Sequence, residues 1–414
     1  MTRSFMNSPQ KILIIGNGPA GVEAARTLRE LNPQVKITIF SKEPYHHYSR
    51  IDLSPFLGDG SNPGELQIYP DHWYGENGIQ VLLNNPATAI FPEEGRVRDS
   101  NGELHPFDRL LIAAGADPFI PPIPGADLPG IQTLRTIADG LQIRKAAKRA
   151  SGVVILGGGI LGIEAAASLR KFELPVTIVE LADHLMPVQL DRSGAAVLQH
   201  LLEQRGIRVR TGTGAAAFNG ESRLQQVELQ NGEKISADMA LISTGIRSNC
   251  ALAEKAGLAC SGGIVVNEHL QTSHPRIYAA GDAAEFQRTV YGIWPAALEQ
   301  AQAAARHMLG EHAVYTGSLP LHILKVIGIE LTALGRKFAS DPAEQVITHR
   351  NYEAGTYVKL IHDGRHLLGA ISLGVSGLGF RLQRLIRRKQ DISAFLPAFE
   401  KSDWSVIMKK RASK

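Results

Sequence analysis

The sequence carries the same short pattern twice: an apolar strand, a turn rich in glycine, and a helix. The first copy begins at Lys11–Ile15 (KILII) and the second at Val153–Leu156 (VVIL). Short apolar runs of this kind are typical of strands buried in a parallel sheet. In each turn the first glycine permits a tight bend, the second lets a diphosphate approach the backbone, and the third lets helix and strand pack closely. Two copies so far apart predict two dinucleotide-binding domains.

We expect each turn to hold a diphosphate on the N-terminus of the following helix, where free N–H groups and the helix dipole favour an anion. The predicted contacts of the first nucleotide are Gly16, Gly18, Pro19, Ala20 and Gly21, together with Lys42 and Glu43 after the next strand. The predicted contacts of the second nucleotide are Gly157, Gly159, Ile160, Leu161, Gly162 and Glu180.

The acidic residue after the second strand of each copy bears on the choice of nucleotide. Glu180 directly follows Val176–Val179, and a carboxylate there accepts both ribose hydroxyls and repels a 2′-phosphate. No arginine follows in residues 181–183, so the pattern favours NADH over NADPH, unless Glu180 only ends a strand at the surface. Glu43 is less clearly placed because two other residues separate it from its strand. It is either a ribose ligand or an exposed loop acid.

Composition narrows the function classes. The net charge of +4 is too small to indicate nucleic-acid binding. It is also uneven: residues 376–414 hold ten Lys and Arg against three Asp and Glu, or +7, which leaves −3 for the rest.

Cys250 and Cys260 are too few for a disulfide framework and lack metal-ligand partners at usable spacing. The start of the chain has no apolar signal region, and the most apolar stretch, 153–169, is too short to span a membrane. We therefore expect a cytoplasmic protein without a resident metal.

Several segments resemble the pyridine nucleotide–disulfide oxidoreductase superfamily. GNGPAG (16–21) and RIYAAGD (276–282), a predicted third strand that ends in Gly-Asp, are similar to its two FAD signatures, and GGGILGIEAA (157–166) is similar to its NADH signature. LLIAAGA (110–116) and LISTGIR (241–247) resemble its connecting strands. The resemblance implies an α/β protein with two Rossmann-like dinucleotide-binding domains plus a C-terminal α+β domain. The FAD-binding domain would comprise residues 1–118 and 246–315, the NADH-binding domain 119–245, and the C-terminal domain with its basic tail 316–414.

The resemblance assigns further residues to the FAD. Asp282 would accept a hydrogen bond from the ribitol chain; its alternative role is that of a turn aspartate at the end of a strand. Pro295 is expected at the first position of a helix, and the resemblance aims the N-terminus of that helix at the flavin. Trp294 would cover the flavin ring or serve as a core aromatic. The remaining contacts that the resemblance implies are Ala114, Gly115, Gly245, Gly281 and Ala296.

The loop expected beside the flavin decides the branch of the superfamily. Residues 45–54 contain no cysteine, so no redox disulfide is expected there. The loop instead resembles that of rubredoxin reductases, ferredoxin reductases and the flavin part of NADH-dependent nitrite reductases, although Pro55 stands where ferredoxin reductases commonly carry a lysine. The resemblance makes Glu164 and Arg50 the candidate catalytic pair beside the flavin. The alternatives are a helix acid in the first turn for Glu164 and a surface or phosphate contact for Arg50.

These features predict an NADH-dependent FAD flavoprotein reductase that passes electrons to a small iron–sulfur or rubredoxin-type carrier. The alternatives are the flavin component of a nitrite reductase-like complex, an NADH:quinone dehydrogenase, and an FAD- and NADH-binding sensor or scaffold protein. A basic helix is predicted over 381–389, where five basic residues fall at helical spacing: Arg381, Arg384, Arg387, Arg388 and Lys389. This basic set has three interpretations: a docking face for an acidic carrier, a solvated helix face, or a contact with anionic lipid. No nucleic-acid partner is expected, and a homo-oligomer stays open.

Overall fold

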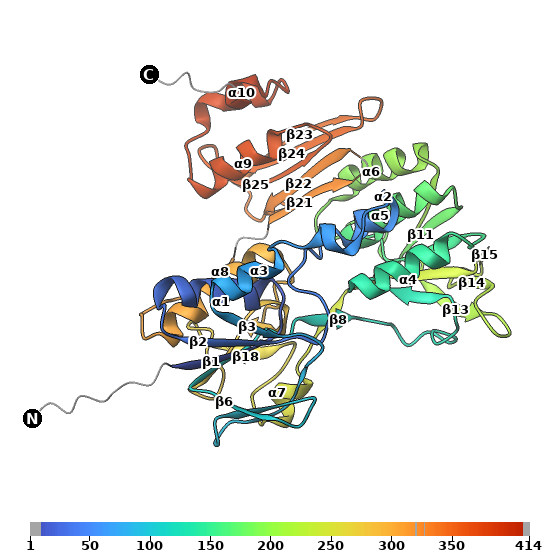
Figure 1. Ribbon diagram of the computed structural model, residues 1–414. Coiled ribbons are helices and arrows are strands. Elements are labelled where there is room, and N and C mark those ends of the chain that lie inside the picture. Colours follow the sequence, from blue (N-terminus) through green and yellow to red (C-terminus); the bar gives the residue numbers. More distant parts are fainter. Residues whose placement is uncertain (1–9, 319–320, 327, 409–414) are drawn as a thin grey trace, which may run out of the picture. The chain divides into compact units, whose positions relative to one another are not determined.

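The computed structural model describes residues 10–318, 321–326 and 328–408 (Figure 1). The chain divides into two compact units, each assembled from separate stretches of sequence. The first unit comprises Met1–Ile51, Asn62–Asp117 and Ile246–Leu319. The second unit comprises Asp52–Ser61, Pro118–Gly245 and Pro320–Lys414.

A five-stranded parallel sheet forms the centre of the first unit. Its strands lie in the order β3-β2-β1-β7-β19. They are β1 (Lys11–Ile15), β2 (Lys36–Phe40), β3 (Ile79–Leu82), β7 (Arg109–Ile112) and β19 (Ile277–Ala279). The central strands β1 and β7 and the strand β19 are almost entirely buried, as expected for a parallel sheet that is covered on both faces, whereas the edge strand β3 is only partly buried. Helices α1 (Pro19–Leu31) and α8 (Trp294–Met308) pack against each other beside this sheet (Figure 1).

Shorter elements complete the first unit. An antiparallel sheet holds β4 (Ala87–Phe91), β5 (Arg96–Asp99) and β6 (Leu104–Pro106). Two strand pairs join β8 (Ala116–Pro118) to β17 (Ile246–Ser248), and β18 (Ile264–Val266) to β20 (Ala284–Phe286). The remaining helical pieces are η1 (Pro63–Leu66), α3 (Asp71–Glu76), α7 (Ala251–Lys255) and η3 (Gly281–Ala283).

The second unit repeats this plan around another parallel sheet, in the order β12-β11-β10-β16-β9. Its strands are β9 (Ile131–Thr133), β10 (Val153–Leu156), β11 (Val176–Glu180), β12 (Ile207–Thr211) and β16 (Met239–Ile242). Its helices are α2 (Leu53–Asp59), α4 (Ile137–Ala147), α5 (Ile160–Leu169), η2 (Arg170–Phe172) and α6 (Arg192–Gln204). A small antiparallel sheet holds β13 (Ala215–Asn219), β14 (Gln226–Leu229) and β15 (Lys234–Ser236). In both parallel sheets the strand that precedes the glycine turn is central.

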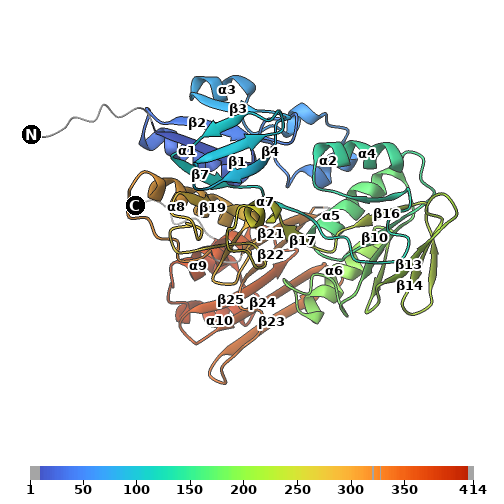
Figure 2. The same ribbon diagram turned by 90° about the horizontal axis from the view of Figure 1, so that it is seen from below.

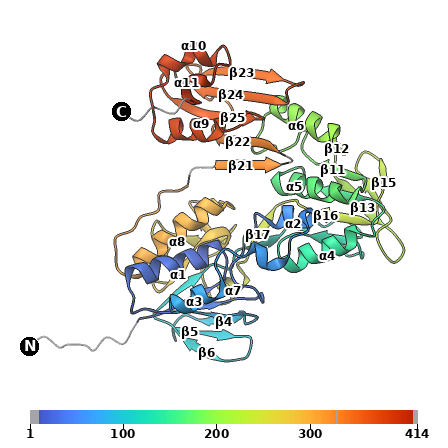
Figure 3. The ribbon, with the colours of Figure 1, turned by 45° about the horizontal axis from the view of Figure 1, so that its top comes forward.

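The C-terminal part of the second unit is an antiparallel sheet in the order β21-β22-β25-β24-β23. Its strands are β21 (Leu321–Val326), β22 (Ile329–Gly335), β23 (Gln345–Asn351), β24 (Thr356–His362) and β25 (Leu367–Leu373). Helix α9 (Leu378–Arg387) packs on β22 and β25 through buried leucines (Figure 3). The chain continues through η4 (Ser393–Phe395), α10 (Leu396–Phe399) and α11 (Ser405–Met408).

A buried polar contact ties this C-terminal sheet to the parallel sheet of the same unit. Asp191 caps the N-terminus of α6, which packs against β23, β24 and β25 (Figure 2). Its carboxylate accepts hydrogen bonds from the Tyr357 hydroxyl at 2.7 Å and the Lys359 ammonium at 2.8 Å. Because the pair is buried and both carboxylate oxygens of Asp191 accept hydrogen bonds, it fixes the position of the sheet on α6.

The structure confirms the predicted α/β class with two Rossmann-like domains and a C-terminal α+β region. Three local expectations were wrong. Helix α8 begins at Trp294, so Pro295 is its second residue. The basic helix runs from Leu378 to Arg387, and Lys389 lies beyond it with a positive φ of 45°. The third predicted strand of the first unit is shorter than 276–282, because residues 281–283 form a 3-10 turn.

The predicted division into four segments stays a prediction. The structure groups residues 52–61 and the C-terminal sheet with the stretch 118–245 in one compact unit. No helix among the described residues is both long and apolar enough to cross a membrane.

Candidate functional site

The first glycine turn is fixed by backbone contacts that leave no room for side chains. Gly16 follows β1 with a φ of +114°, and a Cβ added there would lie 2.1 Å from the carbonyl oxygen of Ala113 at the end of β7. A Cβ on Gly21 would lie 2.0 Å from the carbonyl oxygen of Gly16. Both distances are far below van der Waals contact, so the chain itself requires glycine at these two positions.

The second glycine turn repeats this geometry. Gly157 has a φ of +110°, and an added Cβ would lie 2.2 Å from the carbonyl oxygen of Ser243 at the end of β16. A Cβ on Gly162 would lie 2.0 Å from the carbonyl oxygen of Gly157. In both units the turn lies where the neighbouring strands lead to opposite sides of the central strand, which is where open α/β sheets bind ligands.

The middle glycine of each turn is different, because nothing in the chain requires it. Gly18 and Gly159 have ordinary extended backbone angles, and a Cβ on either would meet no atom within 4 Å. Each is the N-cap of its helix, with no capping side chain and no acidic residue in the first turn. Open space beside free N–H groups fits a diphosphate at both turns. Pro19 and Ala20 begin α1, and Ile160 and Leu161 begin α5, so all four line these helix starts.

The Glu180 carboxylate is held at the second turn. It accepts hydrogen bonds from the backbone N–H of Gly158 at 2.7 Å and of Ala182 at 2.8 Å. These bonds fix the carboxylate against the glycine turn, although Glu180 lies at the end of a strand as the alternative interpretation expected. Its role as a ribose ligand stays a prediction.

Glu43 is not an exposed loop acid. Its side chain is 15% exposed and pairs with Arg50 at 2.7 Å, and it also accepts a hydrogen bond from the Tyr48 hydroxyl at 2.6 Å. Both carboxylate oxygens therefore have partners inside the loop 43–50. The Arg50 guanidinium also lies over the Tyr48 ring, 5.1 Å from its centroid. Lys42 makes a half-exposed ion pair with Asp117 at 3.3 Å.

A neutral histidine lies in the same loop. His47 is buried, and burial followed by the charge of Arg50 lowers the pKa of its imidazole to about 4. Its ring centroid is 5.5 Å from that of Trp294 at the start of α8. The first helical turns therefore bring Trp294, Pro295 and Ala296 to the loop predicted to lie beside the flavin.

Glu164 lies on α5 in the second unit, five residues into the helix, so the alternative interpretation as a first-turn acid is wrong. Burial and the nearby negative charge of Asp52 raise the pKa of its carboxyl group to about 7, while the Ser54 hydroxyl opposes the shift. A group with this pKa changes its protonation state near neutral pH, which is the range that proton-transfer groups use.

The turn at Gly281 and Asp282 is held by residues that sequence reasoning missed. The Gly281 N–H donates to the side-chain oxygen of Gln300 at 2.8 Å, and Gln300 is 1% exposed on α8. The Ser248 hydroxyl donates to the Asp282 carbonyl oxygen at 2.7 Å. A glutamine on a helix face otherwise made of alanines was the available signal for Gln300.

Asn249 performs the same task for a second turn of the first unit. Its side-chain amide donates to the carbonyl oxygen of Ala114 at 3.1 Å, and its backbone N–H donates to that of Gly115 at 3.0 Å. Gly245, in the second unit, accepts a hydrogen bond from the backbone N–H of Phe119. Gly115 and Gly245 have positive φ angles, so both occupy turns that favour glycine.

Comparison with known proteins decides the family. A model described as pyridine nucleotide-disulphide oxidoreductase matches residues 10–307, and one described as the rubredoxin NAD+ reductase C-terminal domain matches residues 320–390. The chain therefore belongs to the pyridine nucleotide-disulphide oxidoreductase family. This confirms the resemblance on which the site residues were predicted, whereas their individual roles stay predictions.

The relatives of this chain include proteins of about its own length and proteins about twice as long. The chain is 34% identical over 386 residues to a nitrite reductase [NAD(P)H] of Bacillus subtilis (strain 168), covering 93% of this chain and 48% of the relative. It is 33% identical over 362 residues to the ferredoxin reductase component of chlorobenzene dioxygenase from Cupriavidus sp. (strain PS12), covering 86% and 87%. The chain thus spans about half the length of the nitrite reductase relatives that it matches.

A solved structure supports the same assignment. The crystal structure of a ferredoxin reductase from Rhodopseudomonas palustris matches with a TM-score of 0.86 and 25% identity, covering 96% of this chain and 100% of that one. Although the family name refers to a disulphide, the loop 45–54, which is predicted to lie beside the flavin, has no cysteine, and Cys250 and Cys260 are free thiols.

One group of side chains in the described part of the chain has the composition of a metal site. Asp99, Glu103 and His105 bring their ligand atoms within 4.8 Å of one another. The Asp99 carboxylate already accepts hydrogen bonds from His105, from Asn85 and from two backbone N–H groups, which lower its pKa to about 2. These bonds account for the cluster, and we assign no metal to it.

The two kinds of glycine predict opposite effects of the same substitution. Gly16→Ala should prevent stable folding, since its Cβ would overlap a carbonyl oxygen. Gly18→Ala, at an N-cap, should lower the free energy of unfolding by no more than about 1 kcal/mol but weaken dinucleotide binding at least about tenfold. Denaturant unfolding and cofactor titration separate the two effects, and Gly157→Ala and Gly159→Ala provide the matched pair in the other unit. Equal binding by Gly18→Ala and wild type would contradict the assignment.

The raised pKa of Glu164 predicts a pH-dependent stability. A carboxyl whose pKa rises on folding stabilises the protein below its unfolded value, and this stability is lost as the pH rises through about 7. Glu164→Gln removes the loss, so its stability relative to wild type should increase by about 2 kcal/mol from pH 5 to pH 8, allowing for partial exposure. Denaturant unfolding at both pH values measures this. A difference that is constant with pH would show that Glu164 titrates normally.

Proposed function

We propose that this protein is an NADH-dependent FAD flavoprotein reductase that passes electrons from NADH through its FAD to a small iron–sulfur or rubredoxin-type carrier. The observation that carries the proposal is the pair of glycine turns, each with a middle glycine that the fold does not need and a helix N-terminus without a cap. Two such turns in separate units provide for two different dinucleotides. We assign the FAD-binding domain to residues 1–118 and 246–315 and the NADH-binding domain to residues 119–245.

The residues of the first unit fit a flavin dinucleotide. Gly18 and the start of α1 would receive the diphosphate, and the turn at Gly281 and Asp282, which Gln300 and Ser248 hold in place, would receive the ribitol chain. When bound, FAD accepts a hydride from NADH and can release the electrons one at a time. The protein's part is to bind, orient and tune, and the uncapped N-terminus of α8 offers partial positive charge for that purpose.

Charge in the flavin-side loop is arranged around Arg50. Glu43 pairs with its guanidinium and the Tyr48 ring lies under it, while burial and, to a lesser degree, the Arg50 charge lower the pKa of His47 and keep it neutral. We propose that Arg50 supplies the positive charge that a lysine provides in ferredoxin reductases at the position of Pro55. Glu164, with its pKa near 7, would hold or release a proton on the side of the second unit.

The electron acceptor follows from what the loop lacks. Residues 45–54 contain no cysteine, so no thiol pair stands ready beside the flavin to take both electrons. The ferredoxin reductase relative and the match to a rubredoxin reductase C-terminal domain both favour a small iron protein as the acceptor. We place the reaction in the cytoplasm, where free thiols such as those of this chain stay reduced.

A second function has a specific observation in its favour. The nitrite reductase relative is as similar as the ferredoxin reductase, and the chain covers about half of it. The protein would then act as the flavin part of a redox complex, with a separate subunit as acceptor. Co-purification of such a subunit distinguishes this function from the first.

The exposed side of α9 is the surface that we assign to the carrier. Arg384, Arg387 and Arg388 are exposed and make no ion pair with an acidic side chain among the described residues. The nearby Asp391 is already paired with Arg365 at 3.1 Å. Phe380, one turn before Arg384, is 59% exposed, and an aromatic beside arginines is typical of the centre of a protein interface. The positive charge favours an acidic protein partner.

The geometry of Glu180 predicts the choice of reductant. Glu180→Ala should raise KM for NADH about tenfold and reduce the preference for NADH over NADPH, because the carboxylate that repels a 2′-phosphate is gone. Glu180→Gln keeps the hydrogen-bond acceptor at Gly158 but removes the charge. This variant should therefore gain NADPH use while losing less NADH use than Glu180→Ala does. Steady-state kinetics with both nucleotides test this. Unchanged selectivity in both variants would refute the role.

The carrier step is tested by anaerobic stopped-flow mixing of NADH-reduced protein with ferredoxins, rubredoxins and quinones. We expect fast electron transfer to one class of acidic iron protein, and about tenfold slower transfer by Arg384→Glu/Arg387→Glu, with flavin reduction by NADH unchanged. Arg208→Glu/Lys234→Glu makes the same charge change elsewhere on the exposed surface of the second unit and serves as the control. Transfer to quinones alone, or an equal loss in both variants, would contradict the assignment.

A further inference from the structure

The two cysteines of the chain lie against each other in the first unit. Cys250 is the N-cap of α7 and is 9% exposed, and Cys260 is partly exposed on the loop after this helix. Both belong to the same hydrophobic cluster, and the Cys260 thiol is within hydrogen-bonding contact of the Cys250 sulfur. The two cysteines are ten residues apart in the sequence. They form a thiol pair in the first unit, whereas the loop 45–54 contains no cysteine.

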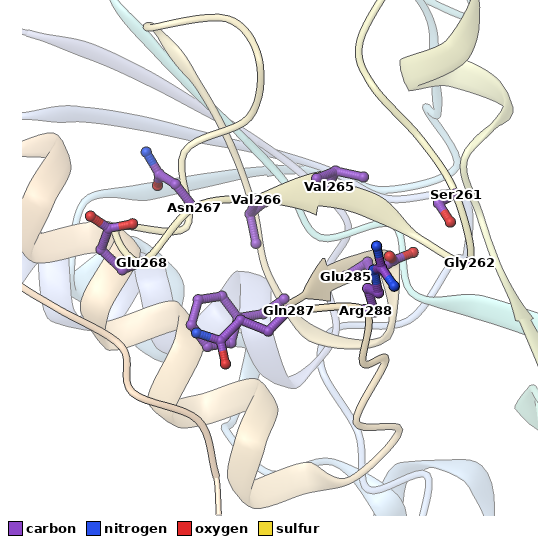
Figure 4. A pocket seen from close by; sticks show the side chains of 10 residues that line it. Ser261, Gly262, Val265, Val266, Asn267, Glu268, Glu285, Gln287 and Arg288 are labelled. Atoms are coloured by element: carbon purple, nitrogen blue, oxygen red, sulfur yellow. The ribbon is translucent and has the colours of Figure 1, made fainter.

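A surface pocket of about 700 Å³ begins at the residue after Cys260 (Figure 4). Ser261, Gly262, Val265, Glu285 and Arg288 are among the residues that line it. The pocket therefore opens beside the loop that carries Cys260, although neither cysteine is among the residues that line it.

We propose that Cys250 and Cys260 form a reversible intramolecular disulfide, with a hydroperoxide reaching Cys260 through this pocket. The Cys260 thiolate attacks the peroxide oxygen, which breaks the O–O bond, forms a sulfenic acid and releases water or an alcohol. The Cys250 sulfur then attacks the Cys260 sulfur, forming the S–S bond and releasing water. Both electrons come from the thiols and reduce the peroxide, and a dithiol reductant reverses the change.

The charges around the pair determine how fast it reacts. Burial, together with the carboxylates of Glu254 on α7 and Glu285 on β20, raises the pKa of both thiols, that of Cys260 to about 11. Only about one Cys260 in 10⁴ is then ionised at pH 7, and the thiolate is the reactive form. The pair is therefore slow to oxidise at neutral pH, and its rate should rise about tenfold per pH unit up to pH 9.

Oxidation at Cys250 would affect the turns that bind FAD, a consequence that rests on the proposed function. The Cys250 N–H donates to the carbonyl oxygen of Ser248, whose hydroxyl holds the Asp282 turn. Asn249, between these two residues, holds the turn at Ala114. A bond that pulls Cys250 towards Cys260 strains these contacts and should lower FAD affinity.

The test uses the full purified chain, reduced, freed of reductant and treated with hydrogen peroxide at pH 7, 8 and 9. The protein is then alkylated under denaturing conditions and analysed by mass spectrometry. We expect a mass loss of two hydrogens, no alkylation of either cysteine, and full reversal by dithiothreitol. The rate of this change should show the predicted pH dependence. Cys250→Ser should accumulate oxygen on Cys260 instead, and Cys260→Ser should leave Cys250 unoxidised.

Any of three results for the wild-type protein would overturn the proposal. Both cysteines are still alkylated after peroxide treatment, Cys260 gains oxygen without the loss of two hydrogens, or the protein forms disulfide-linked dimers. The mass readout needs neither NADH nor a carrier, so its failure is distinct from failure of the proposed reductase function. Measured separately, FAD affinity that is equal in the reduced and oxidised proteins would refute only the link to the cofactor turns.

Discussion

The close approach of two backbones at the glycine turns is the constraint on which the rest of the structure depends. Gly16 contacts the end of β7 and Gly157 the end of β16 at distances that exclude any side chain. These contacts fix the angle at which each strand leads into its helix, and so they direct a helix N-terminus into the crevice above the sheet. The open space at Gly18 and Gly159 follows from the same geometry. One local constraint, used twice, thus shapes both of the turns that we propose as diphosphate sites.

The three glutamates of the candidate site have different electrostatic environments. Glu180 is held by two backbone N–H groups, and Glu43 by an arginine and a tyrosine. Glu164 lies instead in a buried place beside another acid, which makes its ionised form costly. These environments are the basis for the three roles that we propose: selecting a nucleotide for Glu180, orienting a cation for Glu43, and exchanging a proton near neutral pH for Glu164.

The parts of the fold that the sequence predicted are those that depend on local geometry. Glycine spacing and apolar strands predicted both Rossmann-like domains because each strand–turn–helix is specified by neighbouring residues. The partners of Glu43 and the contact between Gln300 and Gly281 were not predicted, since they depend on how distant segments pack. The end of the basic helix was misplaced because the chain turns at Lys389, a residue with high helix propensity that tertiary packing overrides. The grouping of residues 52–61 with the second unit likewise depends on contacts of Phe56 with α4 that no motif records.

The central claim is that one unit holds a flavin and the other presents NADH to it, without a thiol pair between nicotinamide and acceptor. Its most direct test is an anaerobic titration of the purified protein with NADH, followed through the visible absorption of the flavin. The account predicts a yellow protein with stoichiometric FAD that is bleached by equimolar NADH and far less readily by NADPH. A colourless protein that stays colourless after incubation with excess FAD, or a bound flavin that NADH does not reduce, would contradict it.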